Sequence, residues 1–139
     1  ASAKLTVDCR VPPGHADATA RRRLAEMLDG IDGHEVTFTD VVVGNGSPVD
    51  SPLYEAIERW IGHEEPDARV VPTMLPAFTD SRTFRNAFPD IVAYGFFPQR
   101  EMNLYDSWGM VHGADERIAA ADVEWAARAY AAIARDLLG

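Results

Sequence analysis

The sequence holds a single cysteine, Cys9, so no disulfide can form within the chain, and a reducing compartment is favoured. It has no apolar run near the roughly 20 residues that a membrane-spanning helix needs. The first residues carry no basic stretch with a long apolar one behind it, which predicts no signal peptide. Together these absences predict a cytoplasmic protein that does not enter a membrane.

Positive charge is also scarce, with 13 lysines and arginines against 22 aspartates and glutamates and a formal net charge of −9. An excess of negative charge repels polyanions, so nucleic acids and anionic membrane surfaces are disfavoured as partners. The length of 139 residues and the hydrophobic fraction of 47% are sufficient for a domain with a core. The acidity by itself identifies no substrate.

The first third of the chain, residues 1–46, has the pattern strand, helix, strand. Residues 5–11 alternate apolar and polar side chains, and residues 35–43 are again strand-like, as is typical of half-buried strands. Between them, Asp17 is the expected N-cap of a helix. Two strands covered by one helix are too few elements to form a stable fold of their own, so we expect this part to belong to a larger domain.

A polar segment rich in glycine and proline, Gly44–Asp50, predicts a domain boundary. Beyond it, residues 47–139 alternate helical and strand patterns, which predicts an α/β domain with a mainly parallel sheet. Ser51 followed by Pro52 is a clear helix start. The elements expected next are strands at 69–73 and 91–96, a short helix begun by Thr79, and a last helix over 122–138 with a buried stripe of Val123, Ala127, Tyr130, Ala134 and Leu137.

Among the 4 histidines, His15, His34 and His63 lie beside turns or helix ends among charged residues and are expected on the surface. His112 differs, because it follows the apolar residues 108–111 and precedes a glycine and acidic residues. An imidazole that leaves an apolar segment beside carboxylates suits a metal ion. A structural histidine is the alternative, since no second histidine or cysteine stands at a ligand spacing.

A second candidate, Arg82, lies near the start of the short helix. Its planar guanidinium suits bidentate binding of a carboxylate, whereas a solvated surface arginine is the alternative. Asp80 is expected to stabilise the positive end of the helix dipole. Asp115 and Glu116 either support His112 or form the charged approach to the last helix, and the sequence favours neither.

Four segments, in this order, resemble the C-terminal part of the M20 family of zinc-dependent peptidases and deacylases, the relatives of aminoacylase, acetylornithine deacetylase and succinyl-diaminopimelate desuccinylase. They are Val7–Gly14 (VDCRVPPG), Leu75–Arg82 (LPAFTDSR), Tyr94–Pro98 (YGFFP) and Val111–Arg117 (VHGADER). The resemblance implies that residues 1–46 are the second half of an inserted α+β dimerisation (lid) domain. It implies that residues 47–139 are the C-terminal α/β part of a catalytic domain.

The family's complete enzymes hydrolyse amide or peptide bonds of N-acyl amino acids or small peptides. Their dinuclear zinc site activates water, and a glutamate moves the proton. The resemblance implies that His112 is a zinc ligand and that Arg82 binds the α-carboxylate of the substrate. It also implies a homodimer of the complete enzyme.

The resemblance places the rest of the family's machinery upstream of the matched region, namely an early His-x-Asp segment, a bridging aspartate, a catalytic Glu-Glu pair and a further acidic ligand. The one Glu-Glu pair, Glu64-Glu65, lies at a helix end after the boundary and is in the wrong order to replace it. The chain therefore supplies at most one zinc ligand and no catalytic residue, so we expect it to be inactive without a missing N-terminal portion. The alternative is a non-catalytic α/β binding or dimerisation module.

Overall fold

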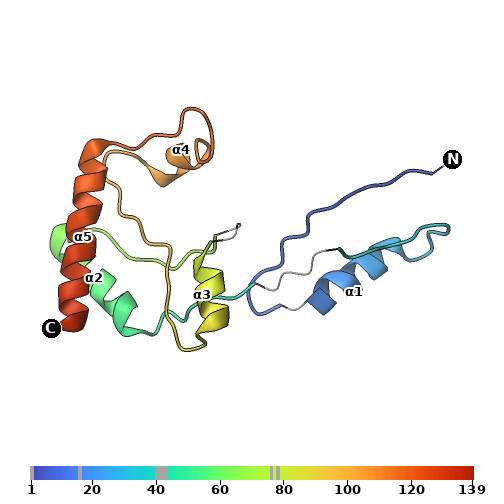
Figure 1. The fold of residues 1–139 in the computed structure, drawn as a ribbon, viewed down its shortest axis with the longest axis horizontal. Coiled ribbons are helices and arrows are strands. Elements are labelled where there is room, and N and C mark those ends of the chain that lie inside the picture. The colour runs from blue at the N-terminus through green and yellow to red at the C-terminus, as the bar shows by residue number, and fades with distance from the viewer. Residues whose placement is uncertain (1, 16, 40–43, 76, 78) are drawn as a thin grey trace. The chain divides into compact units, whose positions relative to one another are not determined.

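The computed structural model describes residues 2–15, 17–39, 44–75, 77 and 79–139 (Figure 1). Within these residues all regular secondary structure is helical. The helices are α1 (Asp17–Leu28), α2 (Pro52–Glu64), α3 (Ser81–Ala87), α4 (Leu104–Trp108) and α5 (Ala120–Leu138). None of these helices is both long and apolar enough to cross a membrane.

The predicted α/β fold is wrong, because the described residues form helices and no strand. Among the described residues, the expected strands at 5–11, 69–73 and 91–96 pair with no neighbouring strand. The same holds for residues 35–39 of the expected strand 35–43, whose residues 40–43 lie outside the described part of the chain. Alternation of side chains predicts a strand, but a strand also needs a neighbour for its backbone hydrogen bonds. Without one, Leu5 stays 85% exposed.

The chain divides into two compact units. Unit 1 comprises Ala1–Ser47 and Leu75–Ile91 and contains α1 and α3. Unit 2 comprises Pro48–Met74 and Val92–Gly139 and contains α2, α4 and α5. The assignment of parts of the chain to a lid and to a catalytic domain follows the motifs, and it stays a prediction.

Unit 2 has its core between α2 and α5, which lie side by side (Figure 1). Ala56 and Ile57 of α2 and Ile133 of α5 form the buried cluster. The partly buried side chains around this cluster are Leu53, Trp60, Ile61, Val70, Tyr94 and Phe96. The last two belong to the expected strand 91–96, so that segment contributes side chains to the core although its backbone joins no sheet.

The start of α2 confirms the predicted cap. Ser51 precedes the helix in an extended conformation, and its Oγ accepts a hydrogen bond from the Tyr54 N–H at 3.1 Å, with Pro52 as the first helical residue. The same Ser51 hydroxyl lies 2.6 Å from the Tyr94 hydroxyl. The Tyr94 hydroxyl also donates to the Pro48 carbonyl. Hydrogen bonds at the cap therefore connect the beginning of α2 to the segment before the helix and to Tyr94.

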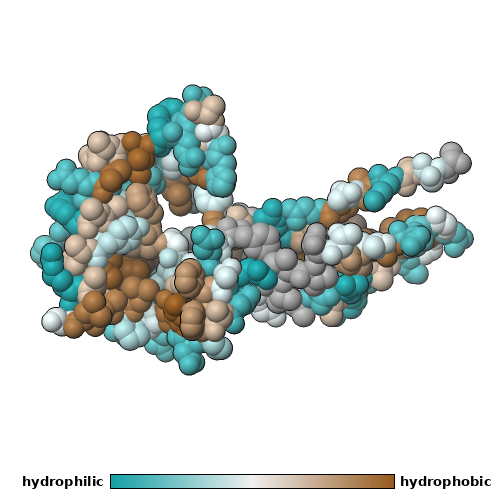
Figure 2. Space-filling model, in the orientation of Figure 1, coloured by the Kyte–Doolittle hydropathy of each residue, from teal (hydrophilic) through white to brown (hydrophobic). Residues whose placement is uncertain are grey.

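The predicted buried face of α5 is wrong. The residues of the predicted stripe are all exposed: Val123, Ala127, Tyr130, Ala134 and Leu137. The buried residues are instead Asp122, Trp125, Ala126, Ala129 and Ile133. The prediction kept every charged residue outside the core, whereas Asp122 is fully buried and fixes the rotation of the helix. Hydrophobic side chains consequently remain exposed along α5, which carries part of the apolar surface in Figure 2.

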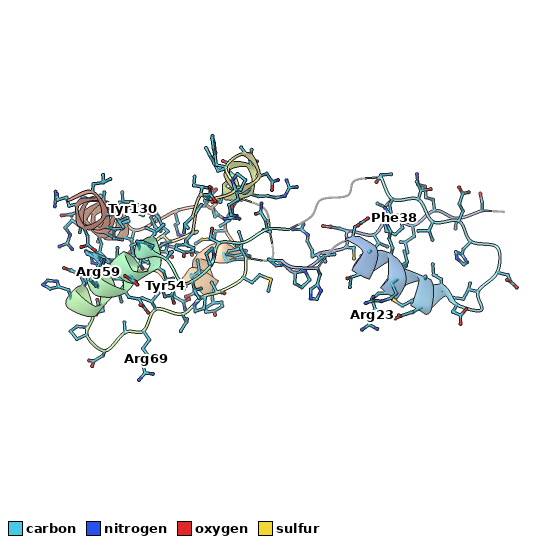
Figure 3. All side chains as sticks on the ribbon, turned by 90° about the horizontal axis from the view of Figure 1, so that it is seen from below. Arg23, Phe38, Tyr54, Arg59, Arg69 and Tyr130 are labelled. Carbon is cyan, nitrogen blue, oxygen red and sulfur yellow. The ribbon has the colours of Figure 1, made fainter. Side chains whose placement is uncertain are left out.

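In unit 1, α1 is held by contacts on its polar side. Arg21 Nε donates to Asp17 Oδ2 at 2.8 Å, and this hydrogen bond lowers the pKa of Asp17. The Arg21 guanidinium also lies 3.9 Å from the ring centroid of Phe38, which is drawn over α1 in Figure 3. After the helix, Gly30 has a φ of 75°, a left-handed conformation that glycine adopts without strain.

Candidate functional site

Arg82 lies in the first turn of α3, in unit 1, and its side chain is half-buried. The helix begins one residue later than the predicted Thr79 cap implies, with Asp80 in the N-cap position. The Asp80 side chain makes no capping hydrogen bond. The Thr79 carbonyl accepts from the Arg82 N–H at 3.0 Å, so Thr79 contributes to the helix start through its backbone.

Asn45 connects α3 to the segment that the sequence marked as a boundary. Its side-chain amide donates to the Arg82 carbonyl at 3.1 Å and to Asn86 Oδ1 at 2.7 Å. Its oxygen accepts from Arg85 Nε at 2.8 Å. Arg82 and Arg85 are three positions apart, and such residues lie on one face of a helix. One asparagine thus contacts three residues of the helix that carries Arg82.

His112 lies in unit 2, in a series of tight turns after α4, and it is exposed. It has a φ of 64°, uncommon for a residue with a side chain. Its backbone N–H donates to Glu116 Oε2 at 3.1 Å, and the Gly113 N–H donates to the Met110 carbonyl at 2.8 Å. A Cβ at Gly113 would lie 3.0 Å from that carbonyl oxygen, a tight contact, so the turn favours a glycine there.

The acidic neighbours of His112 contact the backbone of this turn. The Glu116 carboxylate accepts from the His112 N–H and so holds the turn that carries the imidazole; a role of either acid beside a metal ion stays a prediction. Asp115 acts through its backbone, since its carbonyl accepts from Arg117 Nη1 at 3.2 Å.

The described residues fit a zinc ion only as a partner in a shared site. They contain no group of three or more histidine, cysteine, aspartate or glutamate side chains that could hold a metal ion. A structural or catalytic zinc site takes at least three protein ligands. His112 offers one accessible imidazole on a fixed turn, which suits a single ligand of a site completed by other residues.

The remaining sequence candidates are three histidines and the Glu64-Glu65 pair. His15, His34 and His63 are exposed, as predicted. Glu64 and Glu65 both pair with Arg100: Arg100 Nε donates to Glu65 Oε1 at 2.7 Å, and Arg100 Nη2 lies 3.6 Å from Glu64 Oε2.

Sequence reasoning missed a fully buried charged group of unit 2, Asp122 in the first turn of α5. Its carboxylate accepts hydrogen bonds from the backbone N–H groups of Arg100, Glu101 and Met102 at 2.7, 2.9 and 3.0 Å. The Arg100 side chain crosses the face of Trp125 at 4.1 Å from the ring centroid. An aspartate in a first helical turn ordinarily signals only a dipole contact, so the sequence gives no sign of this role.

The backbone donors around Asp122 make the stability of unit 2 depend on pH. The Arg100 and Glu101 N–H groups hold the pKa of this carboxyl below its usual range. A depressed pKa means that the stabilisation is fully present above the unfolded-state pKa of about 3.9. It is lost as the pH falls through the lower folded-state value.

We therefore expect the melting temperature of the chain to fall as the pH is lowered below about 5. Asp122→Asn should melt lower than wild type at pH 7 and show a flatter pH dependence, because its neutral amide places an N–H against the Met102 donor. The exposed Asp67→Asn is the matched control and should keep the wild-type profile. A wild-type profile in Asp122→Asn would contradict the assignment; thermal unfolding by circular dichroism measures both.

Comparison of the chain with models of protein families, with curated proteins and with solved structures gives no match, so the functional assignment rests on the chain's own residues.

Proposed function

We propose that this chain is the C-terminal portion of an M20-type zinc-dependent hydrolase that cleaves amide or peptide bonds of N-acyl amino acids or small peptides. The observation that carries the proposal is the order of four motif segments along the chain: Val7–Gly14, Leu75–Arg82, Tyr94–Pro98 and Val111–Arg117. A cytoplasmic location and a homodimer of the complete enzyme are part of the same proposal.

In this proposal Arg82 binds the α-carboxylate of the substrate. Two N–H groups of a guanidinium match the two oxygens of a carboxylate. The paired contact therefore orients the substrate, including its scissile amide, in addition to attracting the carboxylate. The half-buried position of Arg82 on α3 supports the role, because a side chain with restricted freedom loses less entropy on binding. The contacts of Asn45 with α3 support it further.

His112 would supply one ligand to a zinc ion. The ion would activate water and polarise the scissile carbonyl when bound. His112 itself contributes an exposed imidazole on a turn, and Glu116 restricts that turn through the His112 N–H. This arrangement supports a ligand whose direction is set before the metal arrives.

Exposed apolar side chains support the part of the proposal that names a missing N-terminal portion. Val123, Tyr130 and Leu137 follow one side of α5 and are 49%, 46% and 41% exposed. In unit 1, Leu5 and Val7 are 85% and 72% exposed. Exposed apolar surface is typical of interaction sites, and in this proposal the N-terminal portion covers it.

The experiment compares the 139-residue chain with the complete enzyme. The chain alone should not hydrolyse N-acetyl amino acids in the presence of zinc, and after dialysis it should retain less than one equivalent of the metal, since a lone imidazole makes no cage. The complete enzyme should hydrolyse these substrates and hold a dinuclear site. Hydrolysis by the chain alone would contradict the proposal, as would a complete enzyme inactive on N-acyl amino acids and dipeptides.

A further inference from the structure

Asn45 has more contacts with α3 than a residue of a passive connecting segment requires. It is half-buried, and its amide makes three hydrogen bonds of 2.7, 2.8 and 3.1 Å with residues 37 to 41 positions further along the chain. A side-chain amide has two donor hydrogens and an acceptor oxygen. Both kinds of group on Asn45 are therefore used for the same helix.

The helix needs such contacts because it is short. α3 has 7 residues, whereas an isolated helix is marginal below about 12–15 residues. Its buried surface gives little help, since none of its residues is fully buried. The direction of a side chain on α3 consequently depends on tertiary hydrogen bonds to the helix, and those of Asn45 reach both its first turn, at Arg82, and its last turn, at Asn86.

We infer that Asn45 is the positioning residue for Arg82, which it orients through the backbone of α3 without touching the substrate. The inference rests on the proposed role of Arg82 in carboxylate binding. The Asn45 amide N–H donates to the Arg82 carbonyl and therefore fixes the Cα from which the Arg82 guanidinium projects. The Asn45 side-chain oxygen accepts from Arg85 Nε and so fixes the neighbouring Arg85 side chain.

The first test uses the 139-residue chain and concerns geometry alone. Asn45→Asp keeps the size and the acceptor for Arg85 but removes both donors, and Asn45→Ala removes all three hydrogen bonds. In both variants the amides that hydrogen-bond to α3 carbonyls, such as the N–H of the C-cap Phe88 that donates to the Phe84 carbonyl, should exchange with solvent roughly 10-fold faster or more. Asn103→Ala, which removes the Tyr105 cap of α4 in unit 2, should leave α3 unchanged.

The second test uses the complete enzyme and a pair of substrates, an N-acetyl amino acid and its analogue without the carboxylate. Asn45→Asp and Asn45→Ala should raise KM for the first roughly 10-fold, with kcat little changed and the analogue unaffected. Arg82→Ala measured alongside should show the same selectivity to a larger extent, and Asn103→Ala should show none.

The outcomes separate the inference from the function on which it rests. Unchanged exchange at α3 would overturn the inference whatever the kinetics. Equal losses on both substrates would also overturn it, because they would show a merely structural role. If Arg82→Ala is selective and the Asn45 variants are not, the inference fails while the proposed function stands. If Arg82→Ala itself is not selective, the role of Arg82 fails, and the inference fails with it.

Discussion

Replacing His112 with alanine is expected to remove one zinc ion from the complete enzyme and to lower kcat roughly 100-fold or more. The physical reason is that His112 would supply one ligand of the site, and without it the enzyme would hold the ion, and the water that the ion activates, more weakly. The fold should be little affected, because the His112 side chain is exposed. Metal analysis and steady-state kinetics on the same preparations measure the two effects.

The backbone of His112 calls for a second variant. At a φ of 64° an alanine is strained, whereas glycine is not, so His112→Gly removes the imidazole without that strain. Both variants should lose the same metal ion. His63→Ala, another exposed histidine of unit 2, is the matched control and should keep full metal content and activity. If His112→Gly retains the zinc content of wild type, His112 is not a ligand.

Replacing Arg82 with alanine should reduce kcat/KM for N-acyl amino acids by roughly 10- to 150-fold, which corresponds to about 1.5–3 kcal/mol for hydrogen bonds to a charged group. The loss should appear mainly in KM, because the carboxylate is bound in the ground state and in the transition state alike. The variant should hydrolyse an analogue without the carboxylate with the same kcat/KM as the wild type.

Two further arginine variants make this result specific. Arg82→Lys keeps the charge but not the planar fork, so it should recover only part of the loss. Arg59→Ala removes an exposed arginine of α2 that pairs with Asp136 at 2.7 Å, and it should leave substrate selectivity unchanged (Figure 3). Equal losses on both substrates with Arg82→Ala would show that the arginine supports the structure and does not bind the carboxylate.

The helix starts show what local sequence can predict. The Ser51-Pro52 pair places the beginning of α2 correctly, because a capping hydroxyl and the fixed φ of proline act within a few residues. Asp17 and Thr79 come within a residue or two of the starts of α1 and α3 for the same reason. By contrast, α4 was not predicted, although Asn103 Oδ1 accepts from the Tyr105 N–H at 2.7 Å and caps it.

The strands show where local sequence fails. Residues 5–11 and 69–73 have suitable side-chain patterns, yet a ladder is made between segments, and the pattern of one segment does not supply its neighbour. The same limit applies to α5. Its apolar residues follow two adjacent faces, and only the tertiary contacts of Asp122 with the N–H groups of residues 100–102 select the face that is buried.

For the candidate site, the sequence by itself determined which side chains have suitable chemistry, namely the imidazole of His112 and the guanidinium of Arg82. That information lies in residue type and motif order. Only the tertiary structure decided what holds each of them. Glu116 fixes the turn of His112 from four positions away, within the same turn. Asn45 reaches α3 from 37 positions away, and no local pattern specifies that partnership, because folding brings the two segments together.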